Sequence, residues 1–307
     1  MAFYAERYEL SGTWLLVPGK KIPVLGDPTN PRCRFCGERP PAATFRKVAH
    51  AIPQSLGNTS LFSAYECDEC NALFGRTIEN DFANWSMPMR TFARIRGKNG
   101  VPTLKNEAAG WRIEYDDDKN SFNINHREGD PVFTVDPDLK QITLRLKRNP
   151  YTPIAVLKAF VKMGLSLMSE SEIQNFSECI GWIREENNSI GFIRNLSVIY
   201  TVAPGAMPND KITAMVLRRR AEYSNVPYSY LVLIYGNEMF QVMLPSPIHD
   251  QELNDQSFSI NPFPHPSARL GTPRWRLLDL MGRETIRGEI TELKVEFSGR
   301  TPVTGKQ

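Results

Sequence analysis

The sequence predicts a mixed α+β fold, in which a small cysteine-rich unit near the amino terminus precedes a larger part with a helical hairpin and an antiparallel sheet. Two CxxC pairs frame the first unit at residues 33–70. Apolar side chains recur at helical spacing over residues 153–183. Short runs rich in β-branched and aromatic residues follow between residues 196 and 244, which indicates the strands of a sheet.

The length of the chain allows more than one structural unit. Its 307 residues, 41% of them hydrophobic, can form one large domain or two ordinary ones. We expect a domain over residues 1–105 that includes an amino-terminal extension, and a β-hairpin bridge over residues 106–149. Residues 150–307 then form an α+β domain that serves in regulation, targeting or assembly.

No segment has the pattern of a targeting or membrane-spanning sequence. The first residues lack a basic stretch followed by a continuous apolar run, and no later run approaches the roughly 18 apolar residues that a spanning helix needs. Four of the five cysteines lie in CxxC pairs and Cys179 stands alone, which favours metal binding in a reducing compartment over disulfides. We therefore expect a cytoplasmic protein without a membrane partner.

The first half of the chain contains one helical pattern and several strand patterns. The apolar run WLLV at residues 14–17 indicates a short strand. From Cys67 onward, apolar residues at helical spacing predict a helix from about residue 68 to 85, which the MPM segment at 87–89 ends. Apolar and polar residues alternate around Asp-rich turns over residues 111–146, which predicts two antiparallel hairpins.

A pair of helices opens the second half of the chain. Thr152 suits the N-cap and Pro153 the first position of a helix with one apolar face, while Lys158 and Lys162 lie on another face. A capping-box pattern at residues 169–172 indicates the start of a second helix. Together they predict a helical hairpin.

The remaining residues predict strands. Runs of β-forming residues occupy 196–202, 211–217, 229–235, 239–244 and 286–297. The third and fourth of these runs are joined at Gly236 and Asn237, a dipeptide suited to a tight hairpin turn. We therefore expect an antiparallel sheet.

Four cysteines have the spacing of a zinc site. Cys33 and Cys36 form one CxxC pair, and Cys67 and Cys70 form the other. A two-residue spacer lets both sulfurs of a pair reach one ion from a turn, so the set suits a tetrahedral Zn²⁺. Because four protein thiolates leave no open coordination position, this ion is structural, and any catalytic ion must be a second one.

The positive charge of the chain is concentrated around these cysteines. Residues 31–105 carry eleven Lys and Arg against six Asp and Glu, whereas the whole chain has a net charge of +3. Basic side chains suit contacts with phosphate oxygens, although such runs also occur as solvated loops. The candidate nucleic-acid-binding residues are Arg46, Lys47, Arg76, Arg90, Arg94, Arg96 and Lys98.

The residues around the cysteines also carry a family resemblance. The segment reads CRFCG, then TFRKVAHAIPQSLGN, then ECDECNALFG. Over roughly residues 30–85 it resembles the HNH endonuclease family, in particular its zinc-stapled members. The resemblance implies a ββα-metal unit, with His50 as the general base that activates water, Asn58 as the residue that orients this His, and Asn71 as the ligand of a divalent cation.

Elementary chemistry agrees with these roles. A neutral imidazole near pH 7 can take a proton from water, its ring must be held by its surroundings, and a cation must neutralise charge on the phosphate. Because amide, water and phosphate oxygens are hard ligands, we expect Mg²⁺ or Mn²⁺ at the catalytic position. Ni²⁺ or Zn²⁺ is the alternative if His50 itself binds the ion.

One position departs from the family pattern. Members of the family often carry Asp, Glu or His directly before the general base, as a second ligand of the cation, and this chain has Ala49 there. Glu79 follows Asn71 by eight residues, which is about 12 Å along a continuous helix and too far to share one ion easily. Three alternatives follow: the cation is held loosely through Asn71, water and the substrate phosphate, or His50 contributes to binding it, or the nuclease is inactive.

The sequence thus predicts a metal-dependent HNH endonuclease that hydrolyses DNA phosphodiesters. The architecture resembles bacterial defence or restriction-type effectors, in which the carboxy-terminal domain controls the nuclease through an activating ligand, a protein partner or a homo-oligomer. The alternative is a non-catalytic, zinc-stapled nucleic-acid-binding protein in which His50 is structural.

Overall fold

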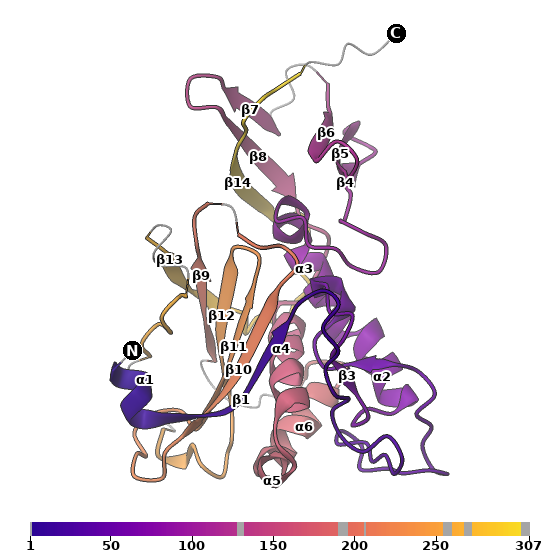
Figure 1. Cartoon of the computed structure of the whole chain (residues 1–307), viewed down its shortest axis with the longest axis vertical. Helices are drawn as coiled ribbons and strands as arrows, with labels where there is room; N and C mark the ends of the chain where they lie inside the picture. The colour runs from indigo at the N-terminus through magenta and orange to yellow at the C-terminus, as the bar shows by residue number, and fades with distance from the viewer. Residues whose placement is uncertain are drawn as a thin grey trace.

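The computed structural model describes residues 2–127, 132–189, 196–205, 207–253, 260–266 and 272–301. A larger body holds a six-stranded sheet, the helices and the cysteine-rich segment, and a smaller β region extends from one end of it (Figure 1). This mixture of helices and antiparallel sheets confirms the predicted α+β class. Within the described part of the chain, no helix has the length and apolar character needed to cross a membrane.

The main sheet is antiparallel throughout and has the strand order β1-β10-β11-β12-β9-β13. Its strands are β1 (Tyr8–Leu16), β9 (Ser197–Val202), β10 (Ile212–Arg219), β11 (Ser229–Tyr235), β12 (Glu238–Leu244) and β13 (Arg274–Asp279). The four predicted strands from 196 to 244 are confirmed, and β11 and β12 pair across the predicted turn. β1 is longer than the predicted run at 14–17, and the sequence patterns did not indicate β13.

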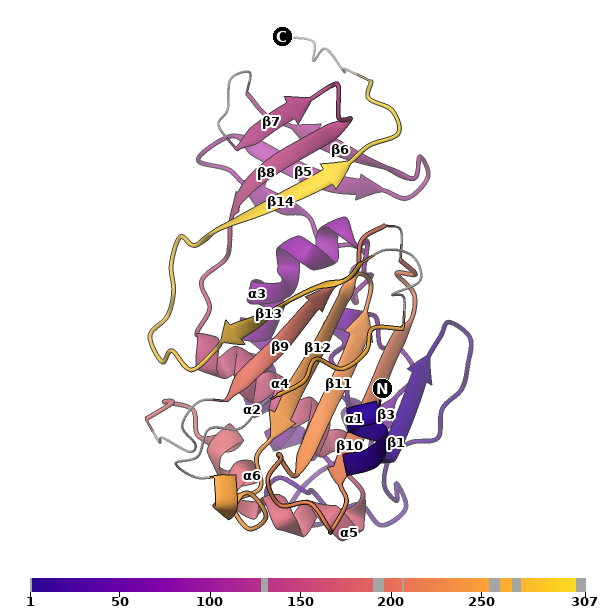
Figure 2. The ribbon, with the colours of Figure 1, turned by 90° about the vertical axis from the view of Figure 1, so that its left-hand side faces the viewer.

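Helices cover one face of this sheet (Figure 2). The central one, α4 (Pro153–Leu167), begins at the predicted Pro153 and is buried along its whole length. It lies between the sheet and the helices α3 (Ile78–Phe92) and α6 (Ser177–Arg184). Gly164 allows this close approach, because a Cβ there would lie 2.4 Å from the Leu244 side chain. The predicted amphipathic helix is therefore a core helix, and its two lysines are buried as well.

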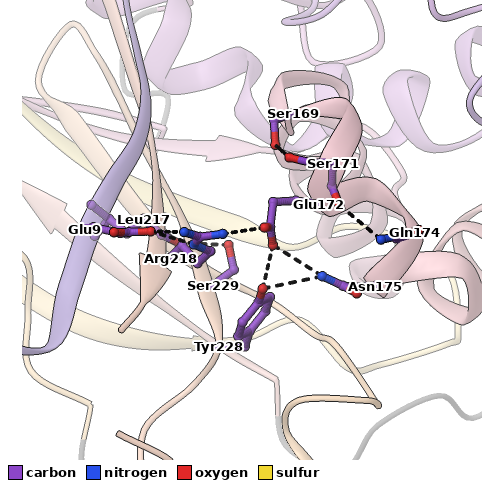
Figure 3. A network of polar contacts seen from close by, with 10 residues as sticks. All are labelled: Glu9, Ser169, Ser171, Glu172, Gln174, Asn175, Leu217, Arg218, Tyr228 and Ser229. Atoms are coloured by element: carbon purple, nitrogen blue, oxygen red, sulfur yellow. Dashed lines mark hydrogen bonds and ion pairs between the residues drawn. The ribbon is translucent and has the colours of Figure 1, made fainter. Parts of the chain in front are cut away.

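The second helix of the predicted hairpin is divided into short pieces. These are α5 (Glu170–Ile173), a 3-10 turn η2 (Gln174–Phe176) and α6 (Ser177–Arg184). The expected capping box does not form, because Ser169 makes no side-chain cap and bonds the Ser171 hydroxyl instead. Glu172 turns toward the sheet, where its carboxylate accepts hydrogen bonds from Arg218 and Tyr228 (Figure 3). This network fastens α5 to β10.

The smaller β region contains two three-stranded sheets. One is formed by β4 (Leu104–Asn106), β5 (Trp111–Asp116) and β6 (Ser121–Asn125), and the other by β7 (Phe133–Asp136), β8 (Gln141–Lys147) and β14 (Ile290–Glu296). The two predicted hairpins are present as β5–β6 and β7–β8. A separate apolar cluster that includes Trp111, Ile113 and Leu144 fills this region.

The larger body and the smaller β region are each built from segments that lie far apart in the sequence. β1, from the first predicted domain, pairs with β10 from the third, and β14 returns from the carboxy-terminal part to pair with β8 of the predicted bridge. One continuous core joins the cysteine-rich segment to α4 and the main sheet. Domain boundaries drawn from local patterns cannot register such pairings, because these pairings join residues more than a hundred positions apart.

The cysteine-rich segment packs on the side of α4 away from the main sheet. Its elements are β2 (Ala49–His50), a 3-10 turn η1 (Gln54–Leu56), β3 (Phe62–Ser63), α2 (Asp68–Arg76) and α3 (Ile78–Phe92). The predicted single helix over residues 68–85 is wrong, since the chain breaks at Thr77, where φ is −110° and ψ is −101°. α3 then continues past the predicted end, with Pro88 inside it. Two short elements, α1 (Ala2–Arg7) and the turn η3 (Gln251–Leu253), complete the described structure.

Candidate metal centre and active site

The four predicted zinc ligands lie together. Their Sγ atoms are all within 4.8 Å of one another, and those of Cys36 and Cys67 are 3.7 Å apart. A tetrahedral Zn²⁺ with Zn–S bonds of about 2.3 Å separates its sulfurs by about 3.8 Å. The donor set and its spacing therefore fit a zinc ion with four thiolate ligands.

Local backbone structure holds each pair of cysteines in position for an ion. The first pair lies on a turn in which the Gly37 N–H donates to the Cys33 carbonyl at 2.8 Å, and Gly37 has φ +82°, a conformation that favours glycine. In the second pair Cys67 is the N-cap of α2, and its sulfur accepts from the Cys70 N–H at 3.5 Å. An ion held here links the turn to the start of α2.

His50 ends the short strand β2. It pairs in register with Phe62 of β3, and the two rings make a T-shaped contact with their centroids 5.2 Å apart. Partial burial lowers the pKa of His50 below its usual value; the nearby Glu79 opposes this shift and Lys162 adds to it. The imidazole is therefore neutral at pH 7, as a general base requires.

Asn58 is fully buried, and its side chain forms hydrogen bonds with backbone groups. Its amide nitrogen donates to the carbonyls of Ile52 and Leu61 at 2.7 and 3.0 Å, and its oxygen accepts from the N–H groups of Ser60 and Leu61 at 3.1 and 2.8 Å. These bonds hold the loop between β2 and β3. Any influence of Asn58 on His50 therefore passes through the backbone of this loop.

Asn71 lies in the first turn of α2, directly after Cys70. Its N–H bonds the Cys67 carbonyl at 2.9 Å, so its position is coupled to the cysteine cluster. The side chain is partly exposed and makes no hydrogen bond to any of the described residues. Its amide oxygen is available to a ligand.

A buried lysine from the second half of the chain reaches this segment. Lys162 of α4 is 1% exposed, and its Nζ lies 2.8 Å from Glu66 Oε2 and 2.9 Å from Glu79 Oε1. The same ammonium donates to the backbone carbonyl of His50 at 3.2 Å. Burial lowers the pKa of Lys162, but the two carboxylates outweigh this effect and raise it above its usual value, so the side chain stays charged.

Lys162 thereby connects the end of β2 with the starts of α2 and α3. Sequence reasoning missed this role, although a lysine in a strongly apolar helix was a signal that it needs buried partners. Glu79 reaches the lysine because it lies at the start of α3, beyond the break at Thr77. The eight-residue distance along a continuous helix, which we expected, does not describe its position.

The candidate DNA-contacting residues form three groups: exposed side chains without an ion pair to a described residue, side chains bound to a neighbouring side chain, and one buried side chain. Arg46, Lys47 and Lys98 are exposed and form no ion pair within the described part of the chain. Arg76 and Arg96 are also exposed but pair with Glu186 and Asp117, at 2.8 and 2.5 Å, and Arg94 donates to Asn120 at 3.2 Å.

Arg90 differs from the prediction. It is 3% exposed, and its guanidinium donates to the carbonyls of Ser55 and Ala83 and to the Ser86 hydroxyl. All three nitrogens are thus engaged inside the protein. Arg90 holds the turn η1 against α3 and is not available to a phosphate group.

Comparison with known proteins supports one family. Residues 33–86 match the family model described as HNH endonuclease, in agreement with the predicted resemblance. The matched segment contains the cysteine cluster and the three polar residues His50, Asn58 and Asn71. No curated protein and no solved structure matches the chain.

Proposed function

We propose that this protein, whose residues 33–86 match the family model described as HNH endonuclease, is a metal-dependent nuclease that hydrolyses DNA phosphodiester bonds. One observation carries the proposal: a half-buried histidine with a lowered pKa ends a two-stranded hairpin beside a cysteine-anchored helix that presents a free Asn71. A purely structural zinc knuckle does not require this combination. β2, β3 and α2 are then the parts of the ββα-metal unit.

In the proposed reaction His50 acts as general base. Its neutral imidazole takes a proton from a water molecule as the water oxygen bonds to phosphorus, and the bond from phosphorus to the leaving oxygen breaks. A bound Mg²⁺ or Mn²⁺ would neutralise charge on the phosphate and the leaving oxygen. Asn71 would hold that cation through its amide oxygen, and Asn58 keeps the loop that follows His50 in place.

Glu79 does not replace the carboxylate that the family often has at the position of Ala49. Glu79 influences His50 electrostatically, but its carboxylate is bound to Lys162 at 2.9 Å. We therefore assign the cation to Asn71, water and the substrate phosphate. Ni²⁺ or Zn²⁺ becomes the candidate if the ion binds His50.

Exposed cations near the hairpin supply contacts for the DNA backbone. The N–H groups of Arg46 and Lys47 donate to the Asp68 carboxylate at 3.1 and 2.8 Å, which fixes this stretch against the start of α2. Their side chains stay free for phosphate oxygens. Lys98, Arg94, Arg96 and Arg76 are the further contacts of this proposal.

The rest of the chain would control where and when the nuclease acts. We retain the role of a bacterial defence or restriction-type effector, whose carboxy-terminal part responds to an activating ligand, a protein partner or assembly into an oligomer. The competing function is non-catalytic DNA binding, which Ala49 and the engaged Glu79 favour.

Plasmid cleavage tests the two functions. Purified protein is incubated with supercoiled DNA and Mg²⁺, Mn²⁺ or EDTA, and we expect nicked or linear DNA only with a divalent ion. His50→Ala removes the base and should lower the rate by roughly 10²- to 10⁴-fold. His126→Ala, an exposed histidine outside the matched segment, is the control and should cut like wild type. Equal cutting by the His50 variant, or DNA binding without any cutting, would favour the alternative.

The pH dependence of cleavage provides a second test. The base must be neutral, so activity is lost as the pH falls through the pKa of His50. Because that pKa lies below its usual 6.5, we expect the acidic limb of the rate profile below pH 6.5. Glu79→Gln removes the charge that raises the pKa of His50, so the limb should move to still lower pH. A limb above 6.5, or a shift to higher pH in the variant, would contradict the assignment of His50 as base.

A further inference from the structure

A cavity of about 610 Å³ lies in the smaller β region, lined by residues of β4 and the turn after it, the end of β8 and the segment that leads into β14. It is lined by four cationic side chains, those of Lys105, Lys147, Arg148 and Arg287, and by a single carboxylate, that of Glu107. The cavity lies outside the segment that matches the nuclease family.

Two of these four cations form ion pairs with carboxylates. Lys105 pairs with Glu107 at 2.8 Å, and Arg148 pairs with Glu289 at 3.2 Å. Within the described part of the chain, Lys147 and Arg287 form no ion pair. The cavity therefore keeps a surplus of positive charge.

The backbone places both Lys147 and Arg287 on the same cavity. Lys147 ends β8 opposite Ile290 of β14, and Arg287 lies in the segment that leads into this strand. Gly288, with φ +79°, lets the Lys147 side chain pass over it, since a Cβ there would lie 3.3 Å from Lys147 Cε. Like charges that line one cavity repel each other, and an anion bound between them offsets the repulsion.

The cavity is also connected to the proposed active site. Arg148 is only 11% exposed and donates to the Trp85 carbonyl on α3 at 2.5 Å. Glu79, which influences His50, precedes Trp85 on the same helix by six residues, about 9 Å along its axis. The helix α3 thus contacts the cavity-lining Arg148 and also carries Glu79, which influences His50.

We propose that this cavity binds phosphate groups of the nucleic acid that the nuclease cuts, with Lys147 and Arg287 as the principal contacts. The inference rests on the proposed function for the identity of the ligand. Lysine and arginine at a positively charged surface are the usual partners of backbone phosphates. The volume also lies in the range of small-molecule sites, so a free nucleotide shares the same chemistry and forms a separate arm of the test.

The test compares two double variants of the full chain. Lys147→Ala/Arg287→Ala removes the unpaired cations, and Lys119→Ala/Lys294→Ala removes two exposed cations of the same β region that do not line the cavity. Binding of a fluorescent DNA duplex is followed by anisotropy with EDTA over a series of NaCl concentrations, and binding of ATP to the same proteins is measured in a separate arm. We expect the first variant to bind roughly tenfold more weakly and its slope of log affinity against log salt to fall by about two, with the control unchanged.

Three outcomes separate the proposals. Equal affinity and slope in both variants, with unchanged melting temperatures, would overturn the role of the cavity. A loss of ATP binding in the first variant while duplex binding is unchanged would also overturn it, in favour of a nucleotide site. If the wild-type protein fails to cut plasmid but its duplex binding depends on Lys147 and Arg287, the nuclease proposal fails and the phosphate site stands.

Discussion

Replacing Lys162 by Met should abolish DNA cleavage and lower the free energy of unfolding by about 3–5 kcal/mol. The buried ammonium neutralises Glu66 and Glu79 and holds the carbonyl of His50, and Met leaves the two carboxylates without a counter-ion. Urea denaturation measures the stability. Single-turnover cleavage is measured at a temperature at which the variant is still folded, and we expect the rate of the chemical step to fall while DNA affinity is retained.

Lys158 provides a matched control for this prediction. It is buried in the same helix one turn earlier, but its Nζ donates to the Glu185 carbonyl at 2.7 Å at the end of α6, away from His50. Lys158→Met should cost stability, about 1–3 kcal/mol, and leave the cleavage rate of the folded protein near wild type. If both variants lose cleavage equally, Lys162 acts through stability alone and does not position His50.

Removing the structural zinc that we assign to the four cysteines should have the second large effect. Structural zinc contributes about 10–16 kcal/mol of apparent folding free energy in small zinc units. Three of the four cysteines are part of the continuous core that also contains α4, so loss of the ion should destabilise more than the hairpin. We expect Cys67→Ser to lose the zinc, to melt at a markedly lower temperature and to lose both DNA cleavage and DNA binding.

Cys179→Ser is the control for the zinc prediction. This cysteine is buried in α6 and does not belong to the cluster of four, so the substitution should reduce stability modestly and leave the zinc content at one ion per chain. Metal content is measured by atomic absorption and melting by circular dichroism. A Cys67→Ser protein with one tightly bound zinc and the melting temperature of wild type would contradict the assignment.

Features that depend on neighbouring residues were predictable from the sequence. The two CxxC pairs determine which sulfurs can meet at one ion, and Thr152 with Pro153 marks the start of α4. The strands between 196 and 244 follow from runs of β-branched and aromatic residues, and the turn at Gly236 and Asn237 joins two of them. Because these signals act over a few residues, they hold without knowledge of the fold.

Features that depend on distant contacts were decided only by the tertiary structure. Sequence alone placed Lys162 on a polar helix face and Arg90 among the phosphate-binding residues, but both side chains are buried among acceptors from other segments. Because the helix breaks at Thr77, Glu79 lies next to Lys162, and the pairing of β14 with β8 places Arg287 on the same cavity as Lys147. The sequence by itself determined which residues can carry the chemistry. Packing of segments far apart in the chain decided which charges are neutralised and which stay free, because burial and pairing are properties of the whole fold.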